Sequence, residues 1–258
     1  MRKLVLNLVM ATLTVLVAFT SCKKNDDDSK VQLHLLETIT YSSGNSIRYT
    51  YDNQSRITKM YMYMGKDLLI TITVTYSEQD VITLTYNDIA NPENNFTGKH
   101  IKNGNTVTFY KNEELAHTIS LNNEEYPIRI EGMVEEQNGE WVPYVYTYQY
   151  QDGNMIQMNY VASVNDIESG NSTEYKYDNK KSPFYNCKSP AWLLGNPLGS
   201  SYGRQNNVIE QISSFFNIKT EYDYEYNAAE YPTKCTMTSK IEGFEGNESK
   251  IIVEFTYR

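Results

Sequence analysis

A short phrase recurs along this chain, in which two tyrosines stand one residue apart and an Asp or Asn turn follows. It occurs at residues 49–53, 148–153, 175–179 and 224–227. Side chains alternate between the two faces of a strand, so both tyrosines of a phrase face the same side. Asp, Asn and Gly accept the backbone angles of a tight turn. Each phrase therefore predicts a β-hairpin.

The segments between these phrases keep the same period of two. Apolar side chains alternate with threonine over residues 70–76 and 82–86, and a similar alternation closes the chain at 251–257. Alternation of this kind is typical of antiparallel strands with one buried face and one wet face.

About fifteen such strands can be drawn, at the spacing of roughly 8 to 12 residues expected for all-β domains. No convincing long helix interrupts them. Hairpins joined in chain order favour an up-and-down meander, and a long meander should curl and close to remove its exposed edges. The predicted fold is therefore all-β: an antiparallel meander that forms a closed or nearly closed, water-soluble barrel. Its interior would be lined largely by tyrosine, of which the chain has 23.

Residues 182–207 break this rhythm, because they combine three prolines and three glycines with the apolar run 191–194. Such a segment cannot form an ordinary strand pair. We expect a long connection whose apolar centre covers one end of the sheet or plugs it. Packing on the core is the simpler interpretation, and a lid that contacts a ligand is the alternative.

The first residues predict export and lipidation. A basic start at Arg2 and Lys3 leads into an apolar stretch over 4–19, which ends just before Cys22. This layout is typical of a lipoprotein signal peptide, and the stretch is shorter than the roughly 20 residues that span a bilayer. We expect a signal at 1–21, an acylated Cys22, a charged tether at 22–30 and one barrel domain at 31–258. An ordinary secretory signal is the alternative.

Charge narrows the possible partners. Loss of residues 1–21 removes two basic and no acidic side chains, so the net charge changes from −9 to −11. An acidic surface argues against nucleic acid and against docking to anionic lipid headgroups. A lipid anchor in the membrane, a polysaccharide or another envelope protein remain as partners.

The cysteines and histidines carry no recognisable chemistry. Cys187 and Cys235 either form one disulfide or remain two separate buried thiols, and the sequence leaves both alternatives open. His34, His100 and His117 lie far apart in the chain, so we expect no metal site of the zinc type and no cofactor.

The tyrosine and Asp/Asn hairpins, the segment 175–185, the Pro/Gly-rich connection and Asn206-Asn207-Val208 together resemble an uncharacterised family of Bacteroidetes lipoproteins with a porin-like fold. Tyrosine and aspartate hairpin repeats also occur in secreted repeat proteins of the Rhs type. The resemblance implies a barrel at the outer membrane, exposed at the cell surface, and it implies no catalytic residue.

The function predicted from these features is non-enzymatic binding of carbohydrate, because sugar faces stack on aromatic rings. The candidate ligand-binding residues are Trp141, Tyr144, Trp192 and Tyr202. One alternative is a structural lipoprotein that binds another envelope protein. A weaker alternative is a glycoside hydrolase built on acidic pairs, although linear sequence cannot show two carboxylates held at a fixed separation. An exposed tryptophan in a concavity would favour sugar, and an exposed apolar patch would favour a protein partner.

Overall fold

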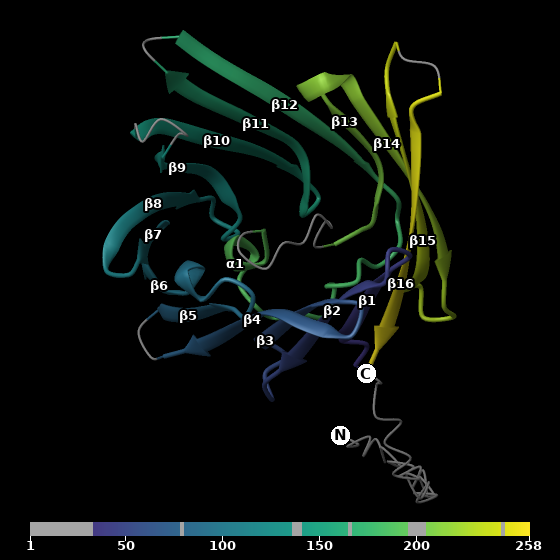
Figure 1. Cartoon of the computed structure of the whole chain (residues 1–258), viewed down its shortest axis with the longest axis horizontal. Coiled ribbons are helices and arrows are strands. Elements are labelled where there is room, and N and C mark those ends of the chain that lie inside the picture. The colour runs from purple at the N-terminus through teal and green to yellow at the C-terminus, as the bar shows by residue number, and fades with distance from the viewer. Residues whose placement is uncertain (1–32, 78–79, 136–140, 165–166, 196–204, 244–245) are drawn as a thin grey trace, which may run out of the picture. The chain divides into compact units, whose positions relative to one another are not determined.

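The structure is a computed structural model that describes residues 33–77, 80–135, 141–164, 167–195, 205–243 and 246–258. Sixteen antiparallel strands form one closed barrel in which each strand pairs with its neighbours in chain order and β1 pairs with β16 (Figure 1). The predicted meander is confirmed, and the sheet closes fully. The strands are β1 (Leu36–Tyr41), β2 (Asn45–Tyr51), β3 (Ile57–Met64), β4 (Asp67–Tyr76), β5 (Val81–Asp88), β6 (Phe96–Asn103), β7 (Thr106–Lys111), β8 (Glu114–Leu121), β9 (Pro127–Glu135), β10 (Trp141–Gln151), β11 (Asn154–Val164), β12 (Ile167–Tyr177), β13 (Val208–Ser213), β14 (Ile218–Tyr226), β15 (Pro232–Ile241) and β16 (Glu248–Tyr257).

Within the described residues, helical structure is limited to three short pieces: η1 (Pro92–Asn94), α1 (Ala191–Gly195) and η2 (Phe215–Asn217). In the ranges that the structure describes, no helix has the length and apolar character needed to cross a membrane.

Inner and outer faces follow the predicted period of two. In β4, Ile72 and Val74 are buried and Thr75 is exposed. In β14 the tyrosines at 222, 224 and 226 face the interior, whereas Glu221 and Asp223 are exposed on the outer wall. The outward positions of the described strands are rich in Thr, Lys and Glu, so the outer wall lacks the continuous apolar band of a strand that faces lipid.

The two ends of the barrel differ, and we call them the closed end and the mouth. The closed end is where β1 begins and β16 ends, and there the backbones of Leu35 and Arg258 exchange hydrogen bonds of 3.3 and 3.0 Å. The chain therefore enters and leaves the barrel at the same end.

Three hairpin turns at the closed end share one design. The side chain of Asp52 accepts hydrogen bonds from the backbone N–H groups two and four residues later, at Gln54 and Arg56. Asn122 and Asn227 do the same in their turns. An Asp or Asn that bonds its own turn in this way fixes the turn locally, so these three turns form from short-range interactions alone.

The turn that follows Tyr177 begins in the same way but is not closed locally, and the hairpin predicted at 175–179 is wrong. Asp178 begins the turn as the others do, and its side chain accepts from the N–H of Lys180 at 3.0 Å. The closing partner is Asn207, whose carbonyl accepts from the N–H of Asp178 at 3.0 Å. The segment between 178 and 207 is thus an insertion into a standard turn. Its prolines and apolar run prevent a hairpin, and residues 182–195 fold into the barrel instead.

This insertion plugs the closed end, as one of the sequence alternatives predicted. We call residues 182–195 the plug. Its apolar side chains join the strands in one buried core; they are Phe184, Cys187, Trp192, Leu193 and Leu194. Ser189 fixes the plug to the wall, because its hydroxyl accepts from the N–H of Ile57 at 2.9 Å and hydrogen bonds the Tyr76 hydroxyl at 2.8 Å.

A column of four rings joins the plug to the wall. His117 of β8, Phe109 of β7, His100 of β6 and Trp192 of the plug lie in sequence, with centroid separations of 4.8, 4.4 and 5.2 Å. Gly98 makes room for the column, since a Cβ there would lie 2.5 Å from the Phe109 ring. Burial, followed by the nearby His117, lowers the pKa of His100 to about 3. Burial lowers the pKa of His117 to about 4. Both imidazoles are therefore neutral near pH 7.

Both remaining cysteines are buried free thiols. Cys187 belongs to the plug and Cys235 to the inner face of β15, and burial raises the pKa of Cys235 to about 12. Of the two alternatives that the sequence left open, the structure has the separate thiols.

The plug predicts a large effect for one leucine. Leu193 is 0% exposed, so Leu193→Ala should lower the free energy of unfolding by about 2–5 kcal/mol through lost burial and a cavity. Leu115→Ala is the matched control, because Leu115 is 64% exposed and its truncation should cost less than about 1 kcal/mol. Urea unfolding followed by circular dichroism measures both. Equal effects would mean that the plug adds nothing to the stability of the barrel.

The ring column predicts a pH dependence. The pKa values of His100 and His117 lie below the unfolded value of about 6.5, so the unfolded chain binds protons first and stability falls as the pH drops below that value. Between pH 7 and pH 5 the loss should reach at most about 2 kcal/mol per histidine. The comparison is urea unfolding of the wild type and of His100→Leu/His117→Leu at both pH values. The double variant should have a flatter pH dependence, and an unchanged slope would contradict the assignment.

Candidate functional site

Tyrosines cover the inner face of the barrel from β10 to β14. Register assigns them to one face, since Tyr146 lies opposite Tyr160 of β11 and Tyr224 opposite the buried Cys235. We call this surface the tyrosine wall; its members are Tyr144, Tyr146, Tyr148, Tyr150, Tyr160, Tyr175, Tyr177, Tyr222, Tyr224 and Tyr226.

Near the mouth the rings of the tyrosine wall form a compact cluster. Tyr146 lies at its centre, with ring centroids 4.7 Å from Tyr160, 5.7 Å from Tyr144 and 6.3 Å from Tyr148. Gly132 of β9 allows this arrangement, because a Cβ at that position would lie 2.9 Å from the Tyr144 hydroxyl. The Tyr144 side chain therefore extends over the bare backbone of the neighbouring strand.

The hydroxyl groups change in character from the closed end to the mouth. Near the closed end three hydroxyls donate to protein acceptors: Tyr177 to the Met155 carbonyl at 2.6 Å, Tyr257 to the Pro232 carbonyl at 2.8 Å, and Tyr226 to Asp178. The hydroxyls of Tyr148 and Tyr150 on β10 have no hydrogen-bond partner among the described residues.

At the mouth, the hydroxyls of Tyr144, Tyr146 and Tyr160 make no hydrogen bond to any residue that the structure describes. These three side chains are only partly buried. Because they face the inside of a closed sheet, the solvent that reaches them lies in the lumen.

Three phenols of the tyrosine wall have a raised pKa. Burial raises the pKa of the Tyr144, Tyr146 and Tyr148 hydroxyls, and neighbouring tyrosines raise each of them further. Each phenol therefore stays protonated and can donate a hydrogen bond.

Polar side chains without charge complete this surface. Asn171 of β12 lies opposite Tyr160, and Gln211 of β13 lies opposite Tyr175. The Gln211 side-chain oxygen accepts from the Tyr222 hydroxyl at 2.8 Å, which orients its amide donor.

Charge is sorted to the outside of the same strands. Among the described residues, inward positions of β10–β16 carry no Asp, Glu, Lys or Arg. The ion pairs lie on the outer wall, where Glu210 contacts Lys176 at 2.6 Å and Lys219 at 3.0 Å, and Lys234 contacts Glu225 at 2.8 Å. A ligand in the lumen would thus meet aromatic faces, hydroxyls and amides in this sector, and no formal charge.

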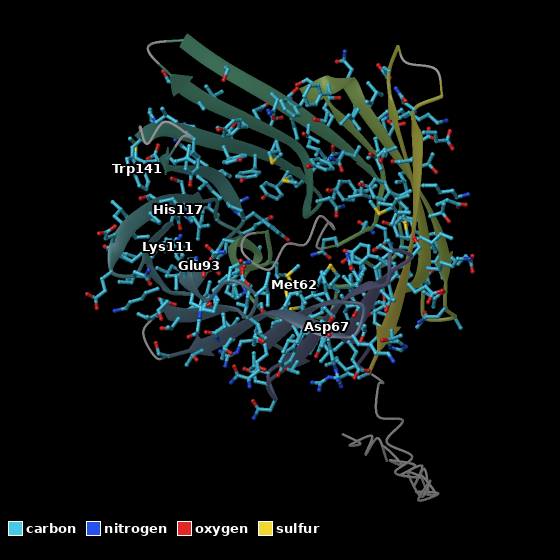
Figure 2. All side chains as sticks on the ribbon, viewed as in Figure 1. Met62, Asp67, Glu93, Lys111, His117 and Trp141 are labelled. Carbon is cyan, nitrogen blue, oxygen red and sulfur yellow. The ribbon has the colours of Figure 1, made fainter. Side chains whose placement is uncertain are left out.

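The structure does not bring together the four ligand-binding residues suggested by the sequence. Tyr144 belongs to the tyrosine wall. Trp141 is 61% exposed but lies on the outer face of β10, at the periphery of the barrel (Figure 2). Trp192 is 3% exposed inside the plug, where no sugar ring can reach its face. Tyr202, like the lipidation candidate Cys22, lies outside the described residues.

Trp141 instead belongs to an apolar patch on the outer wall near the mouth. The patch runs from β8 to β11 and includes Leu115, Met133, Pro143 and Val161, all of them exposed. Exposed apolar groups that cluster in this way are the feature expected of a surface that binds another protein.

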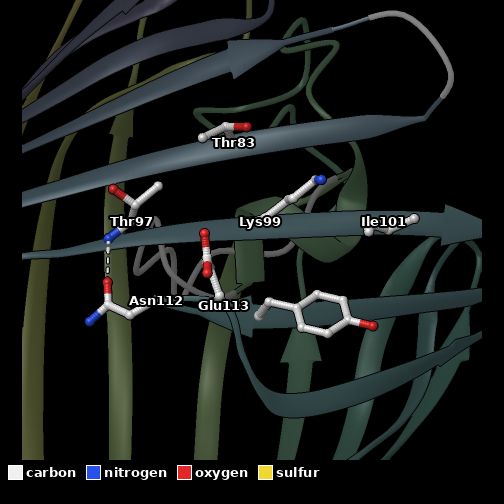
Figure 3. A pocket seen from close by; sticks show the side chains of 7 residues that line it. Thr83, Thr97, Lys99, Ile101, Asn112 and Glu113 are labelled. Carbon is white, nitrogen blue, oxygen red and sulfur yellow. Dashed lines mark hydrogen bonds between the residues drawn. The ribbon is translucent and has the colours of Figure 1, made fainter.

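A hollow of about 740 Å³ lies on the outer wall of β5–β7 (Figure 3). Its lining residues are Thr83, Thr97, Lys99, Ile101, Tyr110, Asn112 and Glu113. The Asn112 side chain accepts a hydrogen bond from the Thr97 N–H at 3.0 Å, so this amide holds the turn together. One lysine and one glutamate among threonines form neither a catalytic pair nor an ion site.

Acidic pairs offer no catalytic centre in the part of the chain that the structure describes. Glu124 and Glu125 are exposed in a turn, and Asp223 and Glu225 are exposed on the outer wall. The side chains of the pair at 135–136 lie outside the described set. Within the described ranges, no group of three or more His, Cys, Asp or Glu side chains could hold a metal ion.

Sequence reasoning missed Tyr146, Tyr160, Asn171 and Gln211. A usable signal was present, because residues an even number apart in one strand share a face. By that rule Tyr146 belongs with Tyr144, whereas Trp141 belongs to the opposite face.

No protein-family model matches this sequence, and no curated protein is similar to it. Among solved structures, a porin-like protein from Bacteroides uniformis ATCC 8492 has 16% identity and a TM-score of 0.49, with 86% of this chain and 96% of that chain covered. A porin-like protein from Bacteroides vulgatus ATCC 8482 has 13% identity and a TM-score of 0.43, with 87% and 99% covered. Both carry the description that the sequence resemblance pointed to. The evidence that this chain forms a closed barrel is its own strand pairing.

Proposed function

We propose that the mouth half of the lumen binds neutral carbohydrate and that the protein is a binding module. The observation that carries this proposal is the change in hydroxyl pairing along the tyrosine wall. Tyr177 and Tyr226, near the closed end, donate to protein atoms, whereas the hydroxyls of Tyr144, Tyr146 and Tyr160 have no partner among the described residues and face the lumen. An aromatic surface with unused donors matches a ligand that has apolar ring faces and many hydroxyls.

Each part of the surface has a role in this proposal. The Tyr146 and Tyr160 rings, 4.7 Å apart, supply the platform on which a sugar face packs. Asn171 and Gln211 supply amide groups that donate and accept hydrogen bonds. The absence of formal charge among the inward residues of this sector favours neutral sugars over anionic ones, because a buried anion without a counter-charge is costly.

The proposal includes export and lipidation at Cys22, which rest on the sequence of residues 1–30. It also includes a barrel surrounded by water, supported by the ion pairs and threonines of the outer wall. The location proposed is the outer membrane, with the barrel at the cell surface.

Protein binding is the second candidate function, and the patch around Trp141 is the observation that favours it. This patch and the tyrosine wall lie on opposite faces of β10, so single substitutions can tell the two functions apart.

The lumen proposal predicts the effect of removing one ring. Isothermal titration of the purified protein against linear gluco-, manno- and xylo-hexaoses should give saturable binding to at least one of them. Tyr146→Ala should weaken that binding about tenfold or more, because it removes a stacking platform and a donor. Tyr146→Phe should weaken it less, since the ring remains.

Trp141→Ala is the matched control, because it removes an exposed aromatic side chain from the outer face of the same strand. It should leave binding unchanged. Loss of binding in Trp141→Ala but not in Tyr146→Ala would move the site to the outer wall. No heat with any neutral hexaose would overturn the proposed function.

A further inference from the structure

The plug and the inward side chains around it close one end of the lumen. Inward side chains near that end are buried on many of the strands; they include Leu36 of β1, Ile57 of β3, Ile82 of β5, Leu121 of β8, Val208 of β13 and Phe255 of β16. The plug fills the space between them with Phe184 and Leu193. A chain-like ligand therefore cannot pass through this end.

The exposure of inward side chains indicates that the mouth is open. Several inward side chains there are exposed, namely Met64 of β3, Val134 of β9 and Ile251 of β16, whereas Val142 of β10 and Ala162 of β11 are buried. Met62, one pleat deeper than Met64, points toward the interior (Figure 2). The lumen is therefore entered from one end only.

The side wall offers no second route. Every strand is hydrogen-bonded to both neighbours, and the pair of β1 with β16 closes the ring. A polymer cannot lie across such a site as it lies along an open cleft, because both of its ends would have to leave through the same opening.

The depth of the free donors is also limited. Tyr144 and Tyr150, the first and last tyrosines of β10, are six residues apart, which corresponds to roughly 20 Å along the strand and about 15 Å along the axis of a tilted barrel. At the level of Tyr150 the hydroxyls of Tyr177 and Tyr226 are already bonded to protein atoms. Only the last few units of a glycan reach the open part of the tyrosine wall.

From this geometry we infer that the lumen recognises the free end of a neutral glycan chain, or a short neutral oligosaccharide, and does not bind the interior of a polymer. The inference rests on the proposed function. In it, the closed end of the lumen decides which class of ligand can bind. The plug then determines specificity without touching the ligand.

The test asks whether the number of binding sites follows the number of glycan chain ends or the total mass of glycan. The probe is the hexaose that binds best among the gluco, manno and xylo series, together with the long linear polymer of the same unit and linkage. Part of that polymer is hydrolysed to a known average length. Titration at equal mass concentration should give a number of binding sites that rises in proportion to the number of chain ends. The intact polymer should show few sites.

The possible outcomes separate the two proposals. If the intact and hydrolysed polymers give equal numbers of sites per unit mass, the ligand binds through internal units and the end-on inference is wrong while carbohydrate binding stands. If no hexaose binds, the proposed function itself is wrong. Tyr146→Ala should remove binding of the hexaose and of the hydrolysed polymer alike, and Trp141→Ala should remove neither.

Discussion

The width of the barrel is the constraint on which the rest of the structure depends. Side chains can fill a barrel of about eight strands, whereas barrels of about sixteen strands leave an open channel. Here sixteen strands enclose one lumen, so their inward residues cannot meet across it unaided. The plug supplies the missing contacts at one end, where Trp192, Leu193 and Leu194 join side chains from several strands in a single core.

The half of the barrel toward the mouth, which the plug does not fill, has a different chemistry. Near the plug and the closed end several tyrosine hydroxyls have protein partners, as Tyr76 does with Ser189 and Tyr177 with Met155. Toward the mouth no such partner is available within the described residues, and Tyr144 and Tyr146 retain open donors. One residue type thus serves two purposes. Tyrosine packs in the core at the closed end, and toward the mouth its hydroxyls are available to a ligand.

Much of the fold could be read from local pattern. The alternation in β4 and β14, the absence of long helices and the Asp or Asn turns depend on interactions within a few residues, so the sequence contains them. The turn at Asp178 could not be read in this way. Its closing partner, Asn207, is far along the chain, and only the packing of the plug inside the barrel decides that the two meet.

The candidate site could be predicted less well for a related reason. A list of aromatic residues does not say which of them share a face, and Trp141 and Tyr144 were grouped although their spacing assigns them to opposite sides of β10. The burial of Trp192 could not be anticipated either. It depends on contacts with His100, a residue of a distant strand.

The even number of strands has a mechanical consequence. A chain that enters at the closed end and crosses the barrel sixteen times returns to that end, where Leu35 and Arg258 are paired. Any force or attachment applied through either terminus therefore acts on the base and leaves the opening unobstructed. With a lipid at Cys22, the residues from 23 to 33 would reach at most about 36–40 Å. If the proposed lipidation holds, that length would be the upper limit on the distance between the base of the barrel and the membrane.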